Sequence, residues 1–238
     1  MMRTDIEDVK CPQSALPGTR TPDIFTVMPR FPAAVCVVAS GPNGRDPALR
    51  IPDSAFTIAV NSAITIPRRF SWWLAFDHRN VCHDFWETIE LGNTRLLFGA
   101  RLVNRLRLQK GAFRHIEPEA YFNYMPMIIA PTKLHPDWKL TPPEECLKPG
   151  LLRGGATASG VALQFAFYAG ARDIILCGAD FEGRGHHDGF NAPDPYDLFG
   201  GVWPYRDAMQ NLIVAIQRRG TRVWTLSDTA LDLPRWEE

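Results

Sequence analysis

Residues 157–180, TASGVALQFAFYAGARDIILCGAD, decide the fold class because a helix pattern leads directly into a buried-strand pattern. Small and apolar residues recur at helical spacing over 157–169, and Gly170 is typical of a helix C-terminus. The next run, 172–177, is apolar almost throughout and predicts a strand buried on both faces, which Gly178-Ala179-Asp180 ends. This succession is typical of an α/β protein.

Similar patterns occur elsewhere in the chain. Strand-like apolar runs are found at 34–39, 56–60, 72–76, 94–98 and 221–225, and helix patterns at 80–91 and 205–219. Helices that alternate with buried strands predict a doubly wound, mostly parallel, Rossmann-like sheet with helices on both faces.

The domain boundaries follow from proline content and periodicity. Residues 1–32 contain five prolines and no period, which predicts a flexible or surface-draped amino-terminal arm. We expect 33–238 to form a single nucleotide-binding α/β domain. Within it, 100–153 is rich in prolines and aromatic residues and fits no regular pattern, so we expect a lid or an acceptor-side excursion.

Composition restricts the function classes. Lys plus Arg equals Asp plus Glu at 26 each, so no overall charge favours a nucleic acid. Five cysteines without a CxxC pair indicate a reducing compartment rather than disulfides or a zinc site. Residues 1–10 do not resemble a signal peptide, and no apolar run is long enough for a transmembrane segment. We therefore expect a cytoplasmic protein; peripheral attachment to the inner membrane face and homo-oligomerisation stay open.

Small and polar residues follow the predicted strands at the point where each strand ends. The clusters are Ser40-Gly41-Pro42-Asn43, Asn61-Ser62, Asp77-His78 and Gly178-Ala179-Asp180. In an open parallel sheet these ends share one edge, where the ligand crevice forms. The alternative is that loops are polar in any protein.

The first candidate for anion binding is the turn Ser40-Gly41-Pro42-Asn43-Gly44. Its glycines would let backbone amides approach a phosphate, although the turn matches neither GxGxxG nor a P-loop. An ordinary turn is the alternative. If the functional interpretation holds, Gly41→Val abolishes nucleotide binding and leaves the protein folded.

The second candidate is residues 154–160, GGATASG, which lead into the long helix. Free amides at a helix N-terminus and the positive end of the helix dipole favour an anion. The alternative is an ordinary helix cap provided by Thr157 or Ser159. Gly160→Val is expected to act like Gly41→Val.

The third candidate is the segment 180–189, DFEGRGHHDG, which contains carboxylates and adjacent histidines. Asp180, His186 and His187 are the candidate catalytic residues, with a histidine as general base. A metal site is less favoured because neighbouring loop residues rarely reach one ion, and a solvated loop is a further alternative. No GxSxG, HExxH or zinc-spaced cysteine motif is present, which disfavours those hydrolase chemistries.

The order of these motifs resembles a known group of enzymes. Ala158–Val161 followed by Asp180-Phe181 is similar to the "TSG…A…G…I.L.G.DF" signature of bacterial sialyltransferases with a single Rossmann-like domain. The related hydroxymethylpterin diphosphokinase (MptE-like) proteins carry the same signature. Val38–Asn43 resembles their amino-terminal "GNGPS" turn. The resemblance covers roughly 33–78 and 154–226.

The resemblance implies a nucleotide bound at the strand ends, with Asp180 nearby. The implied nucleotide contacts are Ser40, Gly41, Asn43, Asn61, Asp77, Ser159 and Gly160. Pro42 and Thr157, in the same turn and helix start, complete the set of candidate contacts. In the sialyltransferases the donor is CMP-sialic acid and transfer needs no metal. In the pterin branch the donor is ATP with magnesium, for which Asp180, Glu182 or Asp188 would be metal contacts.

The chain departs from that family at three positions. The family's threonine before Ser-Gly is Ala158 here, and the tyrosine after Asp-Phe is Glu182. The catalytic histidine before the last helix is missing, since 201–205 reads GVWPY. His186 or His187 would have to act instead. The first hypothesis is therefore a glycosyltransferase-like enzyme with a nucleotide-activated sugar donor, such as a CMP-linked acid sugar, and a small-molecule or glycan acceptor. The alternatives are an ATP- and magnesium-dependent diphosphokinase and a non-catalytic nucleotide-binding module.

Overall fold

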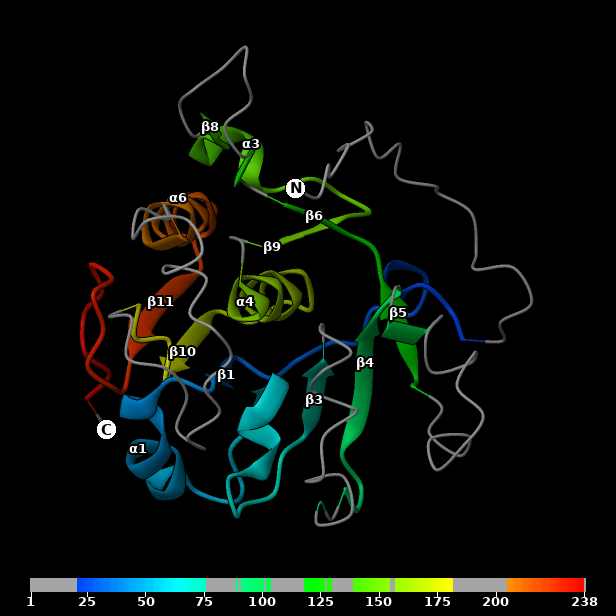
Figure 1. The fold of residues 1–238 in the computed structure, drawn as a ribbon, viewed down its shortest axis with the longest axis vertical. Coiled ribbons are helices and arrows are strands. Elements are labelled where there is room, and N and C mark those ends of the chain that lie inside the picture. Colours follow the sequence, from blue (N-terminus) through cyan, green and yellow to red (C-terminus); the bar gives the residue numbers. More distant parts are fainter. Residues whose placement is uncertain are drawn as a thin grey trace, which may run out of the picture.

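Seven strands lie side by side in one sheet, and every neighbouring pair is parallel (Figure 1). In spatial order they are β11 (Arg222–Thr225), β10 (Asp173–Cys177), β1 (Ala34–Val38), β2 (Thr57–Val60), β3 (Trp72–Ala75), β4 (Arg95–Gly99) and β5 (Ala120–Phe122). The computed structural model describes residues 21–75, 91–100, 118–126, 139–154, 157–181 and 205–237, with 89, 102–103 and 128–129. The predicted α/β class with a parallel sheet is confirmed.

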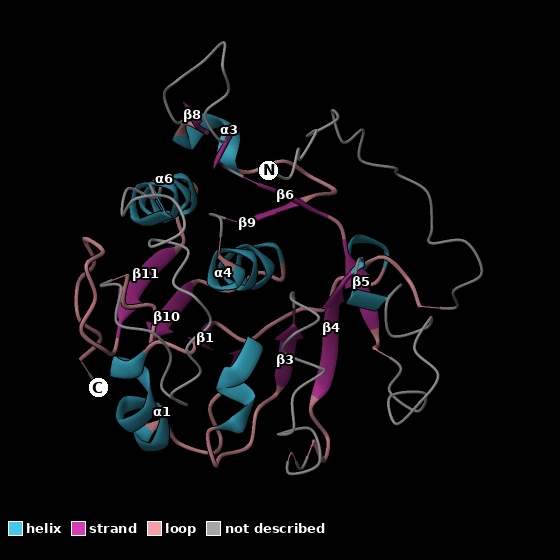
Figure 2. Cartoon of the chain, in the orientation of Figure 1, coloured by secondary structure: helices cyan, strands magenta, loops and turns pink. Residues whose placement is uncertain are grey.

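Helices cover both faces of the sheet, as a doubly wound fold requires (Figure 2). One face carries η2 (Pro42–Gly44), α1 (Arg45–Arg50) and η3 (Asn61–Thr65), and the other carries α4 (Ala158–Tyr168) and α6 (Tyr205–Gln217). The predicted helix at 80–91 lies almost entirely outside the described residues. None of the described helices is long and apolar enough to cross a membrane.

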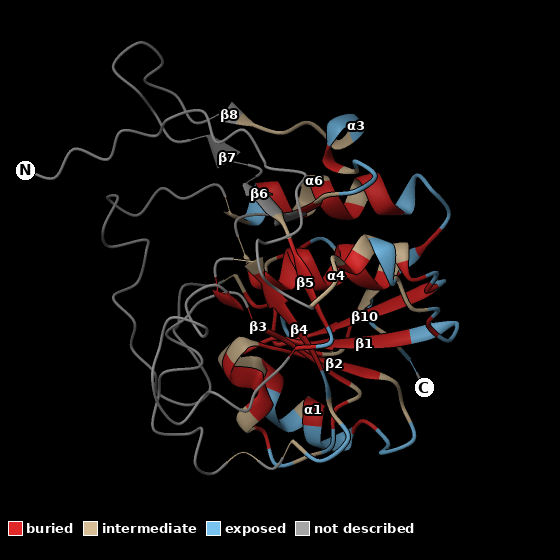
Figure 3. Cartoon of the chain, turned by 90° about the vertical axis from the view of Figure 1, so that its right-hand side faces the viewer, coloured by how far each residue is buried: buried red, intermediate tan, exposed pale blue. Residues whose placement is uncertain are grey.

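A smaller layer lies beyond α4. It contains the parallel pair β6 (Tyr124–Pro126) and β9 (Leu152–Gly154), the antiparallel pair β7 (Ile128–Ile129) and β8 (Lys139–Leu140), and the short helix α3 (Pro143–Cys146). Because β9 packs against α4 on the side away from the sheet, the helix is buried on nearly every side (Figure 3). That environment explains why its sequence is apolar all round.

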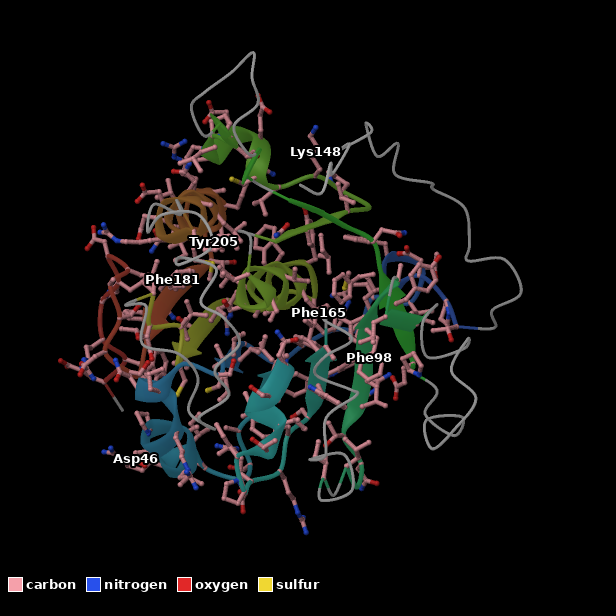
Figure 4. The ribbon with its side chains drawn as sticks, viewed as in Figure 1. Asp46, Phe98, Lys148, Phe165, Phe181 and Tyr205 are labelled. Atoms are coloured by element: carbon pink, nitrogen blue, oxygen red, sulfur yellow. The ribbon has the colours of Figure 1, made fainter. Side chains whose placement is uncertain are left out.

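The alternation of side chains on each strand builds two cores. On β3, Trp72 faces the α4 side, where its ring centroid lies 5.2 Å from that of Phe165. Phe165 points from α4 towards the sheet (Figure 4). The next residue, Trp73, faces the α1 side and contacts Phe98 edge-on. Adjacent tryptophans buried on opposite faces are possible only because strand side chains alternate.

Two boundaries expected from the sequence are corrected. Residues 21–32 are not part of a surface arm, because Ile24 and Phe31 are buried in the core on the α4 side. The excursion at 100–153 contains β5 of the main sheet, and Leu152 is fully buried in the same core. Its described part is therefore integral to the domain rather than a lid alone.

Both edges of the main sheet are covered by segments near the chain ends. A short η1 helix (Ile24–Thr26) begins beside β5, where Tyr121 N–H donates to Pro22 O at 3.0 Å. At the other edge, Thr225 N–H donates to Pro234 O at 3.0 Å and Trp236 N–H to Thr225 O at 2.9 Å. These hydrogen bonds pair part of each edge, which leaves fewer backbone groups for edge-to-edge association.

At the amino edge of the sheet, Asp173 is held by two side chains of β11. Arg222 Nη2 donates to Asp173 Oδ2 at 2.7 Å, and Trp224 Nε1 donates to Oδ1 at 2.9 Å. Burial by itself would raise the pKa of this carboxyl group. The hydrogen bonds and the charges of Arg222 and Arg172 outweigh burial and lower the pKa below its ordinary value of 3.8.

Asp173→Asn is expected to lower the free energy of unfolding by about 1 kcal/mol at neutral pH, since Arg222 is largely exposed to water. The folded-state pKa of Asp173 is depressed. The wild-type advantage is therefore complete above the ordinary carboxyl pKa and is lost as the pH falls through the folded-state value. Urea unfolding of both proteins over the acid range tests this. A difference that stays constant to the most acidic pH would contradict it.

Candidate functional site

The centre of the carboxyl edge of the sheet is a topological switch point. β1 and β10 are neighbours, but β1 is followed by β2 on one side and β10 by β11 on the other. The helices that follow these two strands, α1 and α6, therefore leave towards opposite faces of the sheet (Figure 1). In open α/β sheets ligands bind outside the carboxyl ends of the strands at this position.

The turns after β1 and β10 are joined directly to one another. Ala39 N–H donates to Cys177 O at 2.7 Å, which continues the ladder of the sheet by one residue. Gly41 N–H then donates to Gly178 O at 2.9 Å. The sequence placed both turns at one edge, and the structure brings them into contact.

Asp180 connects the two turns through its side chain. It is 5% exposed, and its Oδ2 accepts a hydrogen bond from Asn43 N–H at 2.8 Å. Asn43 lies in the first turn of η2, whose N-cap residue, Gly41, has no side chain to act as acceptor. Asp180 thus caps this helix start from a distant part of the sequence, as an N-cap side chain would do locally.

This contact changes the interpretation of the turn Ser40–Gly44. One of the amides expected to bind a phosphate already donates to a carboxylate, and a phosphate at that amide would have to displace it. The glycine at position 41 is also explained without a ligand. A Cβ there would lie 2.4 Å from Gly178 O and 2.5 Å from Asp180 Oδ2.

The expectation that Gly41→Val leaves the protein folded is therefore corrected. The φ angle of Gly41 is −63°, an ordinary value, so its backbone does not require glycine. Glycine is required at this position because Gly178 and Asp180 of the β10 turn lie too close for a Cβ. Any larger side chain must push the two turns apart, and loss of nucleotide binding in Gly41→Val would not by itself identify a phosphate contact.

The start of α4 lies at the same edge of the sheet. α4 packs on β1, β2 and β10 and leads into the amino end of β10 through residues 169–172. The N-terminus of α4 is ~16 Å from its C-terminus at a rise of 1.5 Å per residue. It therefore lies near the carboxyl ends of the strands. Thr157 is the N-cap, and its Oγ1 accepts from Gly160 N–H at 3.3 Å.

The cap function of Thr157, one of the two alternatives for this segment, is thus shown. Thr157 Oγ1 also lies 2.8 Å from Ser159 Oγ, so the two hydroxyl groups share a hydrogen bond. Ser159 is 6% exposed and Gly160 is buried as well. The positive end of the α4 dipole and this hydroxyl pair are the part of the edge best suited to an anion.

Two residues at the carboxyl edge have left-handed backbone conformations that side chains disfavour. Asn61, directly after β2, has φ 51°, and Phe181, directly after Asp180, has φ 56°. They are the only non-glycine residues with positive φ in the described part of the chain. Trp73 Nε1 donates to Asn61 O at 2.9 Å and so fixes this turn. Such conformations concentrate at functional sites.

No protein family, curated protein or solved structure matches this chain. The similarity to the sialyltransferases and the MptE-like proteins therefore enters only as support for a proposal.

The buried thiols near the switch point are not suited to nucleophilic catalysis. Burial raises the pKa of Cys36 to about 11 and that of Cys177 to about 12. Cys177 lies at the end of β10, and its Sγ donates to Gly44 O at 3.2 Å. Both thiols stay protonated at neutral pH, and a thiol must ionise to act as a nucleophile.

Several candidates lie outside the described residues, namely Asp77, His78, Glu182, His186, His187 and Asp188. Within the described ranges no group of three or more His, Cys, Asp and Glu side chains could hold a metal ion. The segment with the adjacent histidines begins after Phe181 and ends before Tyr205. Phe181 and Tyr205, which flank this segment, pack against the core on the α4 side (Figure 4).

Sequence reasoning missed the segment that follows β11. Ser227 Oγ accepts from Gly178 N–H at 2.8 Å, and Thr229 Oγ1 donates to Ala179 O at 2.6 Å. The signal was present, because Ser227-Asp228-Thr229 is a polar cluster at the end of an apolar strand, like the four clusters singled out above. The rule applied to the other strands also holds for the last one.

Proposed function

We propose that this protein binds a nucleotide-activated sugar at the switch point and transfers the sugar to an acceptor hydroxyl group. One observation carries the proposal: the turns after β1 and β10 meet at the centre of the carboxyl edge, where the start of α4 also lies. Phosphate-containing ligands of doubly wound sheets bind at such a place.

The two sides of the proposed site have different chemistry. On the α4 side, the helix dipole and the hydroxyl of Ser159 would stabilise the donor phosphate. On the β1 side, the buried carboxylate of Asp180 faces the turn that contains Asn43. A carboxylate accepts hydrogen bonds, so this side suits the hydroxyl groups of the donor rather than its phosphate. Ser40, Pro42 and Asn61 would complete the contacts along the strand ends.

The transfer step needs a leaving group and a base. The acceptor oxygen forms a bond to the anomeric carbon of the sugar while the bond from that carbon to the phosphate oxygen breaks. The nucleotide leaves with the bonding electron pair, and the amides at the α4 start stabilise its charge. The acceptor proton passes to an imidazole, for which His187 or His186 is our candidate.

A diphosphokinase-type reaction with ATP and magnesium is the second candidate. Asp180 favours it, because magnesium in nucleotide enzymes is commonly held by one or two carboxylates together with substrate phosphates. Glu182 and Asp188 would be the further contacts under this proposal. A nucleotide-binding protein without catalysis would show binding but no turnover.

Titration calorimetry with CMP and with ATP, each with and without magnesium, separates these candidates. We expect CMP to bind without a metal, and Ser159→Ala to weaken that binding about tenfold because one hydrogen bond to the phosphate is lost. Ser71→Ala is the matched control, since Ser71 Oγ accepts from Thr57 N–H at the opposite edge.

Binding of ATP only in the presence of magnesium would favour the diphosphokinase. No binding of either nucleotide to the wild type would overturn both proposals. An equal loss of affinity in the Ser159 and Ser71 variants would show that the α4 start is not the phosphate site.

A further inference from the structure

The chain after β11 forms a carboxyl-terminal strap, residues 226–236, that contacts both turns of the candidate site. It leaves β11 at the carboxyl edge, turns, and returns beside the same strand, where Trp236 packs edge-on against Trp224 with ring centroids 5.5 Å apart. An ion pair between Arg235 and Asp228 joins its two halves.

The strap bonds to every residue of the β10 turn Gly178–Asp180. Ser227, 2% exposed, accepts the Gly178 N–H, and Thr229 donates to Ala179 O. Ala230 N–H donates to Asp180 O at 2.8 Å. The hydrogen bond to Ser227 matters for this turn, because the Gly178 amide is buried and would otherwise have no acceptor.

The strap also reaches the β1 turn and α6. Asn43 Nδ2 donates to Asp228 O at 3.4 Å. Asn43 is therefore bound twice, by Asp180 through its backbone amide and by the strap through its side chain. On α6, Arg206 Nε donates to Ala230 O at 2.7 Å, and Gln210 Oε1 accepts from Asp232 N–H at 3.0 Å. The strap therefore links three elements that meet at the switch point.

We propose that Ser227 and Thr229 are positioning residues of the ligand site. They hold the β10 turn at the distance at which Asp180 accepts the Asn43 amide, and without them this part of the site is not preformed. A site that must order a turn on binding loses affinity by the cost of that ordering. This inference rests on the proposed function insofar as the ligand is a nucleotide.

The test compares two threonine-to-valine substitutions that each remove a hydroxyl donor to a backbone carbonyl; Thr229 Oγ1 in addition accepts from Leu231 N–H at 3.2 Å. Thr229, which is half-buried, donates to Ala179 O at the carboxyl edge, whereas Thr221, which is buried, donates to Ala171 O at 3.1 Å at the amino edge. Thr229→Val and Thr221→Val are expected to lower the urea midpoint similarly. Only Thr229→Val should weaken CMP binding, by about tenfold. Thr229→Ser keeps the hydroxyl group and should bind CMP with the affinity of the wild type.

Amide hydrogen exchange gives a readout that does not need the ligand. In Thr229→Val the Gly178 and Asn43 amides should exchange about tenfold faster than in Thr221→Val, because the turn opens locally. Equal exchange of both amides in the two variants would overturn the inference. If the wild type binds no nucleotide, the proposed function fails while this exchange experiment still decides the role of the strap.

Discussion

Gly178→Ala is expected to lower the free energy of unfolding by about 3–5 kcal/mol, because two independent penalties add at one position. The φ angle of Gly178 is 72°, in the left-handed region that residues with a Cβ disfavour. The added Cβ would also lie 2.6 Å from Ala39 O and 3.0 Å from Gly44 Cα. Both atoms belong to backbone, so neither can move aside without separating the turns of β1 and β10.

Two further glycines separate these penalties. Gly220 has φ 91° and no atom within 4 Å of an added Cβ, so Gly220→Ala should show the backbone strain alone, about 1–2 kcal/mol. Gly41 has an ordinary φ, so Gly41→Ala should show the collision alone. Urea unfolding measures all three. If Gly178→Ala cost no more than Gly220→Ala, the two turns could not be in the contact seen here.

The sheet could be predicted from the sequence because its strands are buried on both faces. Such strands are apolar runs with polar ends. The five strand-like runs and the run 172–177 all correspond to strands, and their predicted bounds differ from the observed ones by one or two residues at most. β5 was not predicted because Ala120–Phe122 is short and lies among other aromatic residues in a stretch without a regular period. The covering of α4 by β9 depends on tertiary packing that no local period encodes.

The meeting of the polar strand ends at one edge could be predicted from the sequence, but the contacts between them could not. The polar strand ends of β1 and β10 lie together, as expected, and Asn is one of the residues most often found in a left-handed conformation. The role of Gly41 could not be deduced, because a glycine needed by a ligand and one needed by a neighbouring turn look alike in a sequence. The atom nearest to an added Cβ at Gly41 is Gly178 O, which belongs to a turn far along the chain from Gly41.

The internal cap also bears on how the site is arranged. Asp180 accepts a hydrogen bond from an amide at the start of η2, so that amide is not available to a ligand. Among the described helices that pack on β1 and β2, α4 is the one long enough to present a strong dipole at its N-terminus. Under the proposed function, the nearest candidate base in sequence is in the segment with both adjacent histidines, into which the chain continues from Phe181 after the β10 turn. The base should therefore come from that segment.

Under this proposal, His187→Ala, or in its place His186→Ala, is expected to lower turnover by roughly 10²–10⁴ while nucleotide affinity changes little. A sugar hydroxyl is a poor nucleophile at neutral pH, so a group must take its proton as the new bond forms, and imidazole titrates in the suitable range. The measurement is the steady-state release of CMP from a CMP-linked acid sugar, with calorimetry for CMP binding.

The six histidines allow internal controls, and all of them lie outside the described residues. His135→Ala, in the excursion, should leave turnover unchanged. His78 follows β3 and is the rival candidate, since it is close in sequence to the carboxyl edge. Full activity in both His186→Ala and His187→Ala would remove their segment from the mechanism. Loss of turnover in His78→Ala alone would assign the base to the end of β3, because a general base must lie within hydrogen-bonding reach of the acceptor oxygen.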